Sequence, residues 1–311
     1  MAVALLVSSC SSESDTQKVS SDRTIHFTAS VSGTQTPWSM TRSADDYNNS
    51  LPENAVIDVF IYDDSNNDLS VTQFGSSQTW VYKTVGDADA TTGKSLLAQT
   101  SPEDLPKFPS GCNFVNIFAT FPHNGSVTPS QSSWTFSVST DQTSNAQTSD
   151  LLASEIASTG REFASAVNLD MKHRMAKVLV IFNPTDELSA VNMPNGTISV
   201  SNVKTSVTIS PKTGSVSTSG STTTITALAG EAFFLPPQTI AAGTQFLKFD
   251  LRNNSGGTGI QNVTVKPTTA LELNGGVFYV LTVDVGIVNV SISSTITPWD
   301  KEILPFDPVI L

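Results

Sequence analysis

The sequence has few of the side chains on which catalysis usually depends. Its 311 residues include two cysteines, Cys10 and Cys112, and three histidines. Two cysteines are too few for a disulfide framework, so we predict no disulfide. No histidine has a carboxylate or a cysteine near it in the sequence at the spacing of a metal site. We therefore predict a protein that is not an enzyme, with no catalytic residues, no metal and no cofactor.

Charge and long apolar runs are also scarce. Charged residues make up 14% of the chain, and the net charge is -12. Because affinity for nucleic acids depends largely on Lys and Arg neutralising phosphates, this charge argues against nucleic acid as a partner. After the N-terminus, no apolar run approaches the roughly 20 residues that a transmembrane helix needs. Any attachment to a membrane therefore requires an anchor.

Three short motifs resemble chemical sites only in part. Cys112 follows Gly111 where a strand is expected to begin and has no identifiable base, which favours a small buried residue over a nucleophile. The acidic segment 63–68 lacks the glycine and the distal glutamate of a calcium loop, so a hairpin turn is favoured. The GGTG segment at 256–259 precedes a strand rather than a helix, which indicates a hairpin tip instead of a phosphate loop.

Alternating apolar and polar residues are the main feature of the chain from Thr24 onward. In the segment 24–31, Ile25, Phe27 and Ala29 share one face at the period of two that is typical of a half-buried strand. Turn-forming clusters separate this segment from similar ones, at 55–62, 113–121, 197–203, 223–228, 277–285 and 288–296. Such spacing without interleaved helices is typical of antiparallel sandwiches, so we predict an all-β fold.

Two segments are expected to depart from simple alternation. The segment 150–158 (DLLASEIAS) favours a helix of one or two turns, with a capping residue at Ser149 or Asp150. The segment 177–182 (KVLVIF) is almost continuously apolar, as for a strand that is covered on both faces.

The length of the chain is sufficient for two domains that each bury a core. We expect a leader and polar tether over 1–22, an N-terminal β-sandwich over 23–165, and a C-terminal β-sandwich with a short tail over 166–311.

The N-terminal residues MAVALLVSSC have the order found where the signal peptide of a lipoprotein ends. An apolar stretch leads to small residues and then to Cys10, and the polar segment after it suits a tether. Acyl chains on Cys10 would each contribute about 0.8 kcal/mol per buried CH₂ to membrane attachment. The alternative is a frayed terminus with an incidental thiol.

Several motifs, in this order, resemble the fimbrillin-like lipoproteins of Bacteroidetes, the group with FimA-like and Mfa-like fimbrial subunits. They are the lipobox, IHFTA, Thr-Arg-Ser at 41–43, VIDVFIY, DLLAS at 150–154, NLDMKHRMAKVLV, FLPPQ at 234–238, NGGVFYVLTVDV and ITPW at 296–299. The sequence departs from the family in lacking a basic segment before the apolar stretch and in its short tail after Trp299.

The resemblance implies two transthyretin-like β-sandwich domains in tandem and an assembly mechanism. A precursor is exported as a lipoprotein, and an Arg-specific protease removes the first strand, which opens a groove for a donor strand from another subunit. Cleavage between Arg42 and Ser43 would release the strand with Ile25, Phe27 and Ala29. An ordinary loop arginine at position 42 and cleavage at Arg23 are the alternatives.

The donor strand could be the C-terminal tail, which carries Ile303, Phe306 and Val309. Pro305 and Pro308 lack a backbone N–H, so this tail would form a discontinuous strand. This weakens a role as a stalk subunit and leaves room for a tip or anchor subunit.

Three functions are therefore compared. The first is a structural and adhesive fimbrial subunit on the outer membrane, with other fimbrial subunits and an Arg-specific protease as partners. The second is a monomeric surface lipoprotein that binds a glycan or a host protein through its loops, which exposed tryptophans would favour. The third is a surface hydrolase built from distant loops. The tryptophans concerned are Trp38, Trp80, Trp134 and Trp299.

Overall fold

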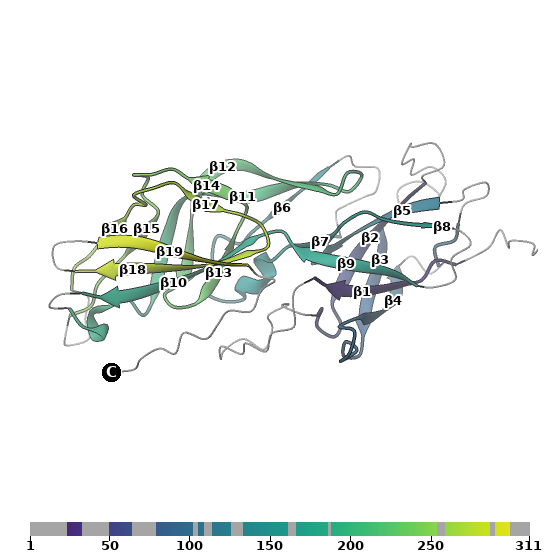
Figure 1. The fold of residues 1–311 in the computed structure, drawn as a ribbon, viewed down its shortest axis with the longest axis horizontal. Helices are drawn as coiled ribbons and strands as arrows, with labels where there is room; N and C mark the ends of the chain where they lie inside the picture. Colours follow the sequence, from purple (N-terminus) through teal and green to yellow (C-terminus); the bar gives the residue numbers. More distant parts are fainter. Residues whose placement is uncertain are drawn as a thin grey trace, which may run out of the picture.

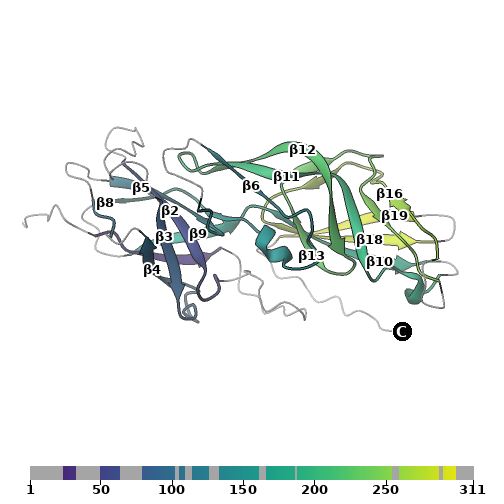
Figure 2. The same ribbon diagram turned by 180° about the vertical axis from the view of Figure 1, so that it is seen from behind.

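The computed structural model describes residues 24–32, 50–63, 79–101, 105–108, 114–125, 133–160, 166–185, 188–253, 259–286 and 290–298. These residues form an elongated molecule with a group of strands at each end (Figure 1). Strands β1 to β5 and β7 to β9 lie at one end, and β10 to β19 lie at the other (Figures 1 and 2). Within the described residues, no helix is long and apolar enough to cross a membrane.

The first group of strands forms a barrel-like sheet. Its order is β2-β3-β4-β1-β9-β7-β5-β8, and an additional pairing of β2 with β5 closes seven of the strands into a ring. All the pairs are antiparallel except that of β1 with β9. The strands are β1 (Phe27–Val31), β2 (Val56–Asp63), β3 (Trp80–Val85), β4 (Ser95–Ser101), β5 (Phe114–Phe121), β7 (Leu152–Ser154), β8 (Ala157–Gly160) and β9 (Val167–His173).

The inside of this barrel is filled by apolar residues that alternate along its strands. Phe27 and Ala29 of β1 meet Ile57 of β2, Ile117 of β5 and Leu169 of β9 in one buried cluster. The predicted inward face of the first strand is therefore confirmed. The all-β prediction is also confirmed, whereas the sheet at this end is closed and contains a parallel pair, which differs from a purely antiparallel sandwich.

The second group of strands surrounds a separate core. One sheet has the order β13-β10-β18-β19, a second has the order β12-β11-β15-β16 with β6 also paired to β11, and β14 pairs with β17. The strands are β6 (Trp134–Ser137), β10 (Ala176–Pro184), β11 (Thr197–Ser210), β12 (Ser215–Leu228), β13 (Ala232–Leu235), β14 (Gln238–Ile240), β15 (Leu247–Phe249), β16 (Val263–Val265), β17 (Leu271–Leu273), β18 (Val277–Val285) and β19 (Val290–Pro298).

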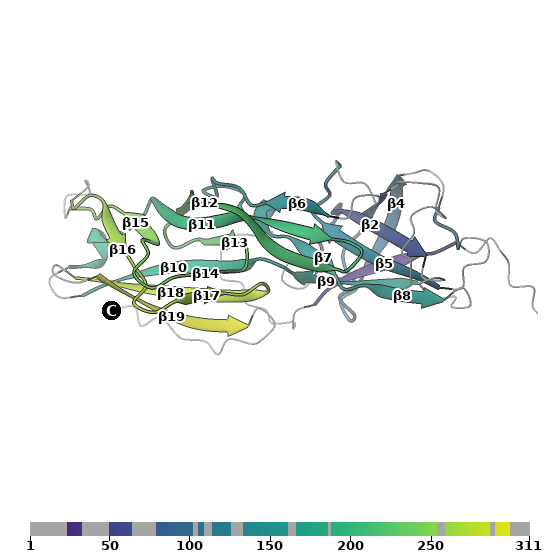
Figure 3. The ribbon, with the colours of Figure 1, turned by 90° about the horizontal axis from the view of Figure 1, so that it is seen from above.

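Side chains of both larger sheets share this second core. Val178 of β10 and Leu281 of β18 belong to the same buried cluster as Val200 of β11, Ile225 of β12 and Leu247 of β15. The alternation predicted for 277–285 is confirmed, because every second residue of β18 from Tyr279 onward is buried. Figure 3 shows these strands running along the length of the molecule.

The helix predicted for 150–158 is wrong. This segment contains strand β7 and the first two residues of β8, and the 3₁₀ helix η2 (Ala146–Ser149) precedes it. Leu152 packs into the barrel core, while its neighbours Leu151 and Ala153 pack into another buried cluster. Because an extended segment with both faces buried has consecutive apolar residues, its pattern imitates a short helix.

The strand predicted to be covered on both faces is covered on only one face over part of its length. Val178 and Val180 of β10 are buried. The next residue along the strand, Ile181, is 44% exposed. The outward face of β10 therefore meets solvent, and the apolar run does not identify a doubly covered strand.

A third apolar cluster joins the two ends of the molecule. Phe60 and Phe118, on the outside of the barrel, pack with Trp134 of β6 and with Val207 and Ile209 of β11. Strand β6 precedes residue 165 but pairs with β11, and β9 follows residue 165 but lies in the barrel. The division of the chain into domains at that residue remains a prediction.

Candidate functional site

Strand β1 lies between two neighbours that come from distant parts of the chain. Its five residues are in parallel register with β9, from Phe27 opposite Val167 to Val31 opposite Met171. On the other side only Thr28 and Ala29 pair with β4, in antiparallel register. We call β1, its two neighbours and the core beneath it the β1 site.

The inward face of β1 is apolar and inaccessible. Phe27 is 4% exposed and Ala29 is completely buried. The Phe27 ring packs edge to face on Tyr82, with ring centroids 5.1 Å apart. Ile25, just before the strand, is buried as well, and its N–H donates to the carbonyl oxygen of Pro106 at 2.8 Å. The side chains of β1 thus form part of the barrel core.

Burial of these side chains favours the folded barrel. Burying one large apolar side chain contributes roughly 1.5–3 kcal/mol. Ile25, Phe27 and Val31, all buried, together contribute roughly 5–9 kcal/mol of burial free energy, which offsets the conformational entropy lost when the segment is ordered. A barrel without β1 would lose this contribution unless another strand replaced it.

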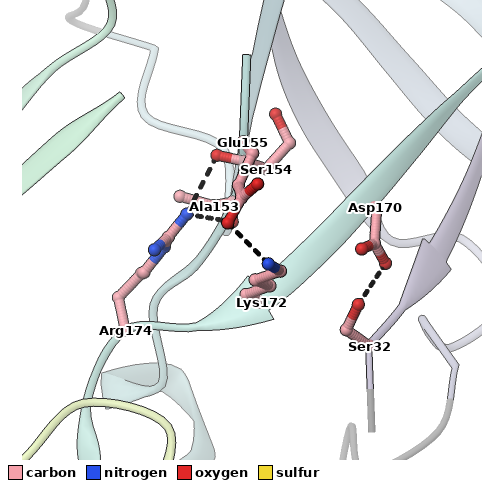
Figure 4. Close-up of polar contacts among 7 residues, drawn as sticks. All are labelled: Ser32, Ala153, Ser154, Glu155, Asp170, Lys172 and Arg174. Atoms are coloured by element: carbon pink, nitrogen blue, oxygen red, sulfur yellow. Dashed lines mark hydrogen bonds and ion pairs between the residues drawn. The ribbon is translucent and has the colours of Figure 1, made fainter. Parts of the chain in front are cut away.

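The outward face of β1 is a row of hydroxyl groups that β9 binds. Asn168 of β9 donates from Nδ2 to Ser30 Oγ at 2.9 Å and accepts at Oδ1 from the Thr28 hydroxyl at 3.2 Å. The Ser32 hydroxyl donates to Asp170 of β9 (Figure 4). Each hydroxyl of the row therefore has a carboxylate or amide partner on one neighbouring strand.

Strand β9 also makes polar contacts on its other side, with the end of β7 and the residue after it. Lys172 Nζ lies 2.5 Å from Glu155 Oε1, on the side of β9 away from β1 (Figure 4). Arg174 donates from Nη2 to the carbonyl oxygens of Ala153 and Ser154 at 3.1 and 3.0 Å. Burial lowers the pKa of the Arg174 guanidinium, although the charge of Glu155 acts in the opposite direction. These contacts tie β9 to β7, whereas Asn168 and Asp170 hold β1.

The structure contains two histidine–aspartate pairs that the sequence did not predict, because the histidine and the aspartate of each pair are far apart in the sequence. His123 Nδ1 lies 2.5 Å from Oδ1 of the fully buried Asp58, whose Oδ2 accepts from the N–H of Asn124 at 2.7 Å. Burial raises the pKa of Asp58, and the hydrogen bonds from Asn124 and His123 partly oppose this shift. His173 Nδ1 lies 2.8 Å from Asp150 Oδ2, and both side chains are buried. Asp58 is on β2 and His123 follows β5, while Asp150 precedes β7 and His173 ends β9, so each pair links two strands that are paired in the sheet.

The residues that the sequence analysis named for processing, binding and lipid attachment lie partly inside and partly outside the described residues. Ile25, Phe27 and Ala29 are in the barrel core, and His26 between them is exposed. Trp80 and Trp134 are buried, so neither is the exposed aromatic that loop-mediated binding would use. Several expected residues lie outside the described residues, namely Cys10, Arg23, Trp38, Arg42, Ser43, Cys112 and Trp299.

The described residues show no arrangement that could hold a metal. No group of three or more His, Cys, Asp or Glu side chains comes together in this part of the chain. A shallow hollow over β18 and β19, with Leu271, Leu281 and Ile292 in its wall, has no charged residue in its lining. Strands β18 and β19 belong to the second group of strands, at the other end of the molecule from β1 (Figure 1).

Comparison with solved structures shows where else this fold occurs. A structure of a proposed cell adhesion protein from Bacteroides uniformis aligns with a TM-score of 0.63 at 17% identity, over 89% of this chain and 98% of its own. A second, from Bacteroides ovatus, aligns with a TM-score of 0.64 at 17% identity, over 90% of this chain and 99% of its own. At this identity the likeness concerns the fold alone. No curated protein matches the chain.

The sequence itself matches the model of one family, described as fimbrillin-like, over residues 41–299. This match covers most of the chain, including all the strands from β2 to β19. It agrees with the resemblance carried by the sequence motifs. The chain therefore belongs to the fimbrillin-like family.

Proposed function

We propose that the protein is a subunit of a bacterial surface fimbria that is assembled by exchange of its first strand. In this proposal the chain is exported as a lipoprotein, is attached to the outer membrane through Cys10, and is cut by an Arg-specific protease between Arg42 and Ser43. A donor strand of another subunit then takes the place of β1. The two transthyretin-like domains expected from the family, divided near residue 165, belong to the same proposal.

The observation that carries this proposal is the position of β1. The strand is short, its inward side chains are buried, and it is joined to β2 through the residues 32–55, which include Arg42. A single cut in that connection would leave β1 held only by non-covalent contacts. Its departure would expose apolar core and unpaired backbone groups of β4 and β9, and an added strand would satisfy both.

The proposal is tested by processing the protein outside the cell. A Cys10→Ala chain is treated with an Arg-specific protease, the new N-terminus is sequenced, and the product is run unboiled on a denaturing gel. We expect a new N-terminus at Ser43 and a ladder of heat-sensitive oligomers.

Two variants serve as controls for the cleavage site. Arg42→Ala should abolish both the cut and the ladder, whereas Arg23→Ala should change neither. A chain that is cut at Ser43 and remains monomeric would contradict strand exchange between copies and favour a tip subunit or a monomeric binding lipoprotein.

A further inference from the structure

The outward face of β9 recognises hydroxyl groups on the strand beside it. Thr28 and Ser30 of β1 and Ser32, the residue after the strand, all carry a hydroxyl, and all three bond to Asn168 or Asp170. Half-exposed positions on a strand accept many polar residues, so burial does not require this match. The match depends on the side chains of β9.

Asn168 is suited to setting the register of the strand. Its amide donates to Ser30 and accepts from Thr28, so it spans two alternate positions of β1. A strand shifted by one residue would turn its apolar side chains toward solvent. A strand shifted by two residues toward its C-terminal end would place His26 where Thr28 now bonds to Asn168. The hydrogen bonds thus add a second constraint to that of the apolar face.

The inward face adds a requirement for size. Ala29 is completely buried and lies opposite Ser95 of β4 and Leu169 of β9. A larger side chain at this position would have to displace the neighbouring core, which typically costs about 1–3 kcal/mol. The β1 site therefore takes a small residue between two large apolar ones.

We propose that the β1 site selects a strand with hydroxyl residues at alternate outward positions and a small residue at the inward centre. Asn168 and Asp170 are the residues that determine this specificity. This inference rests on the proposed function, because another strand can bind only where β1 leaves. The occupant is an extended segment of another subunit with the pattern of residues 27–32, parallel to β9.

The tail of this chain does not have that pattern. Residues 303–311 (ILPFDPVIL) contain no serine or threonine, and Pro305 and Pro308 lack the backbone N–H of a strand donor. A second copy of this chain that offered this segment would leave Asn168 and Asp170 without hydroxyl partners. The chemistry of the site thus disfavours residues 303–311 as the donor strand.

Peptide binding to the processed chain tests this selectivity. The protein is cut with the Arg-specific protease, and release of the fragment that contains β1 is measured by mass spectrometry. Three labelled peptides are then titrated into it. One has the sequence of residues 24–32, one has the same sequence with Thr28→Val, Ser30→Ala and Ser32→Ala, and one has the sequence of residues 303–311.

We expect the hydroxyl peptide to bind at least roughly tenfold more tightly than its apolar counterpart. Each hydrogen bond contributes a net factor of about 2 to 12 to the affinity, and the apolar peptide lacks three of them. Asn168→Ala should reduce this preference by lowering the affinity for the hydroxyl peptide. Lys172→Ala is the matched control, because Lys172 is on the same strand but bonds to Glu155, and it should leave the preference unchanged.

Equal affinity for the first two peptides would overturn the inference, as would tight binding of the tail peptide or a preference that Asn168→Ala does not change. If no fragment is released, the proposed function fails, and the recognition is tested in the intact chain. Ser30→Ala and Asn168→Ala should then be non-additive in their effect on unfolding. Additive effects would overturn the inference independently of processing.

Discussion

Gly275 marks a point where two backbone segments approach more closely than a side chain would allow. It precedes β18, and a Cβ atom built on it would lie 2.5 Å from the carbonyl oxygen of Arg174, in the connection between β9 and β10. Next to it, Gly276 donates its N–H to the carbonyl oxygen of Met175 at 2.9 Å. The pair of glycines therefore lets the turn before β18 pack on the crossing between the two ends of the molecule.

We predict that Gly275→Ala destabilises the protein by roughly 1–3 kcal/mol, because backbone must shift to admit the methyl group. The free energy of unfolding is measured in urea by tryptophan fluorescence. Gly196→Ala is the control, because a Cβ at Gly196 would meet nothing within 4 Å. Gly196→Ala should leave the free energy of unfolding unchanged or raise it by about 0.4–1 kcal/mol, because alanine reduces the conformational entropy of the unfolded chain. An equal effect of the two substitutions would show that close approach at Gly275 is not limiting.

At the scale of elements, β1 combines weak pairing on one side with deep burial of its side chains. Only two of its residues pair with β4, while all five pair with β9. A strand of this length adds few backbone hydrogen bonds, so its side chains are expected to supply most of its attachment. This balance is what would allow one strand to be exchanged for another of similar sequence.

We predict that Phe27→Ala lowers the stability of the protein by roughly 3–5 kcal/mol, as is typical when a buried aromatic ring is deleted from a core. His26→Ala, at the exposed neighbouring position, should change it by less than about 0.5 kcal/mol. Both values come from chemical unfolding of the uncut chain. A small effect of Phe27→Ala would mean that β1 contributes little to the barrel, and it would weaken the proposed exchange.

At the scale of the whole molecule, the third apolar cluster couples the two ends. Phe60 on β2 and Trp134 on β6 have ring centroids 5.1 Å apart, and Trp134 lies opposite Ile209 of β11. Because β6 and β11 belong to the second group of strands while Phe60 and Phe118 belong to the barrel, the two ends share a packed interface.

We predict that the unaltered protein unfolds in a single thermal transition and that Trp134→Ala separates it into two. Removal of the indole is expected to cost roughly 3–5 kcal/mol at the interface while leaving each core intact. Scanning calorimetry distinguishes the two cases. Ile181→Ala, at an exposed site on β10, should keep one transition. A single transition at nearly unchanged temperature in Trp134→Ala would contradict coupling through this cluster.

Part of the β1 site could be predicted from sequence. The alternation of Ile25, Phe27 and Ala29 identifies an inward face, and the structure buries all three. Asn168 could not be predicted as their neighbour, because 140 residues separate it from Thr28. A local pattern contains no information on which distant strand lies alongside.

The amino-acid sequence is enough to predict that the chain forms strands, which residues of most strands face inward, and to which family the chain belongs. These properties follow from side-chain alternation and local motifs, which neighbouring residues carry. The closure of seven strands into a ring, the parallel pairing of β1 with β9 and the pairing of β6 with β11 are known only from the fold. Strand pairing and two-sided burial arise between segments far apart in the chain, where each free edge has several geometrically similar partners.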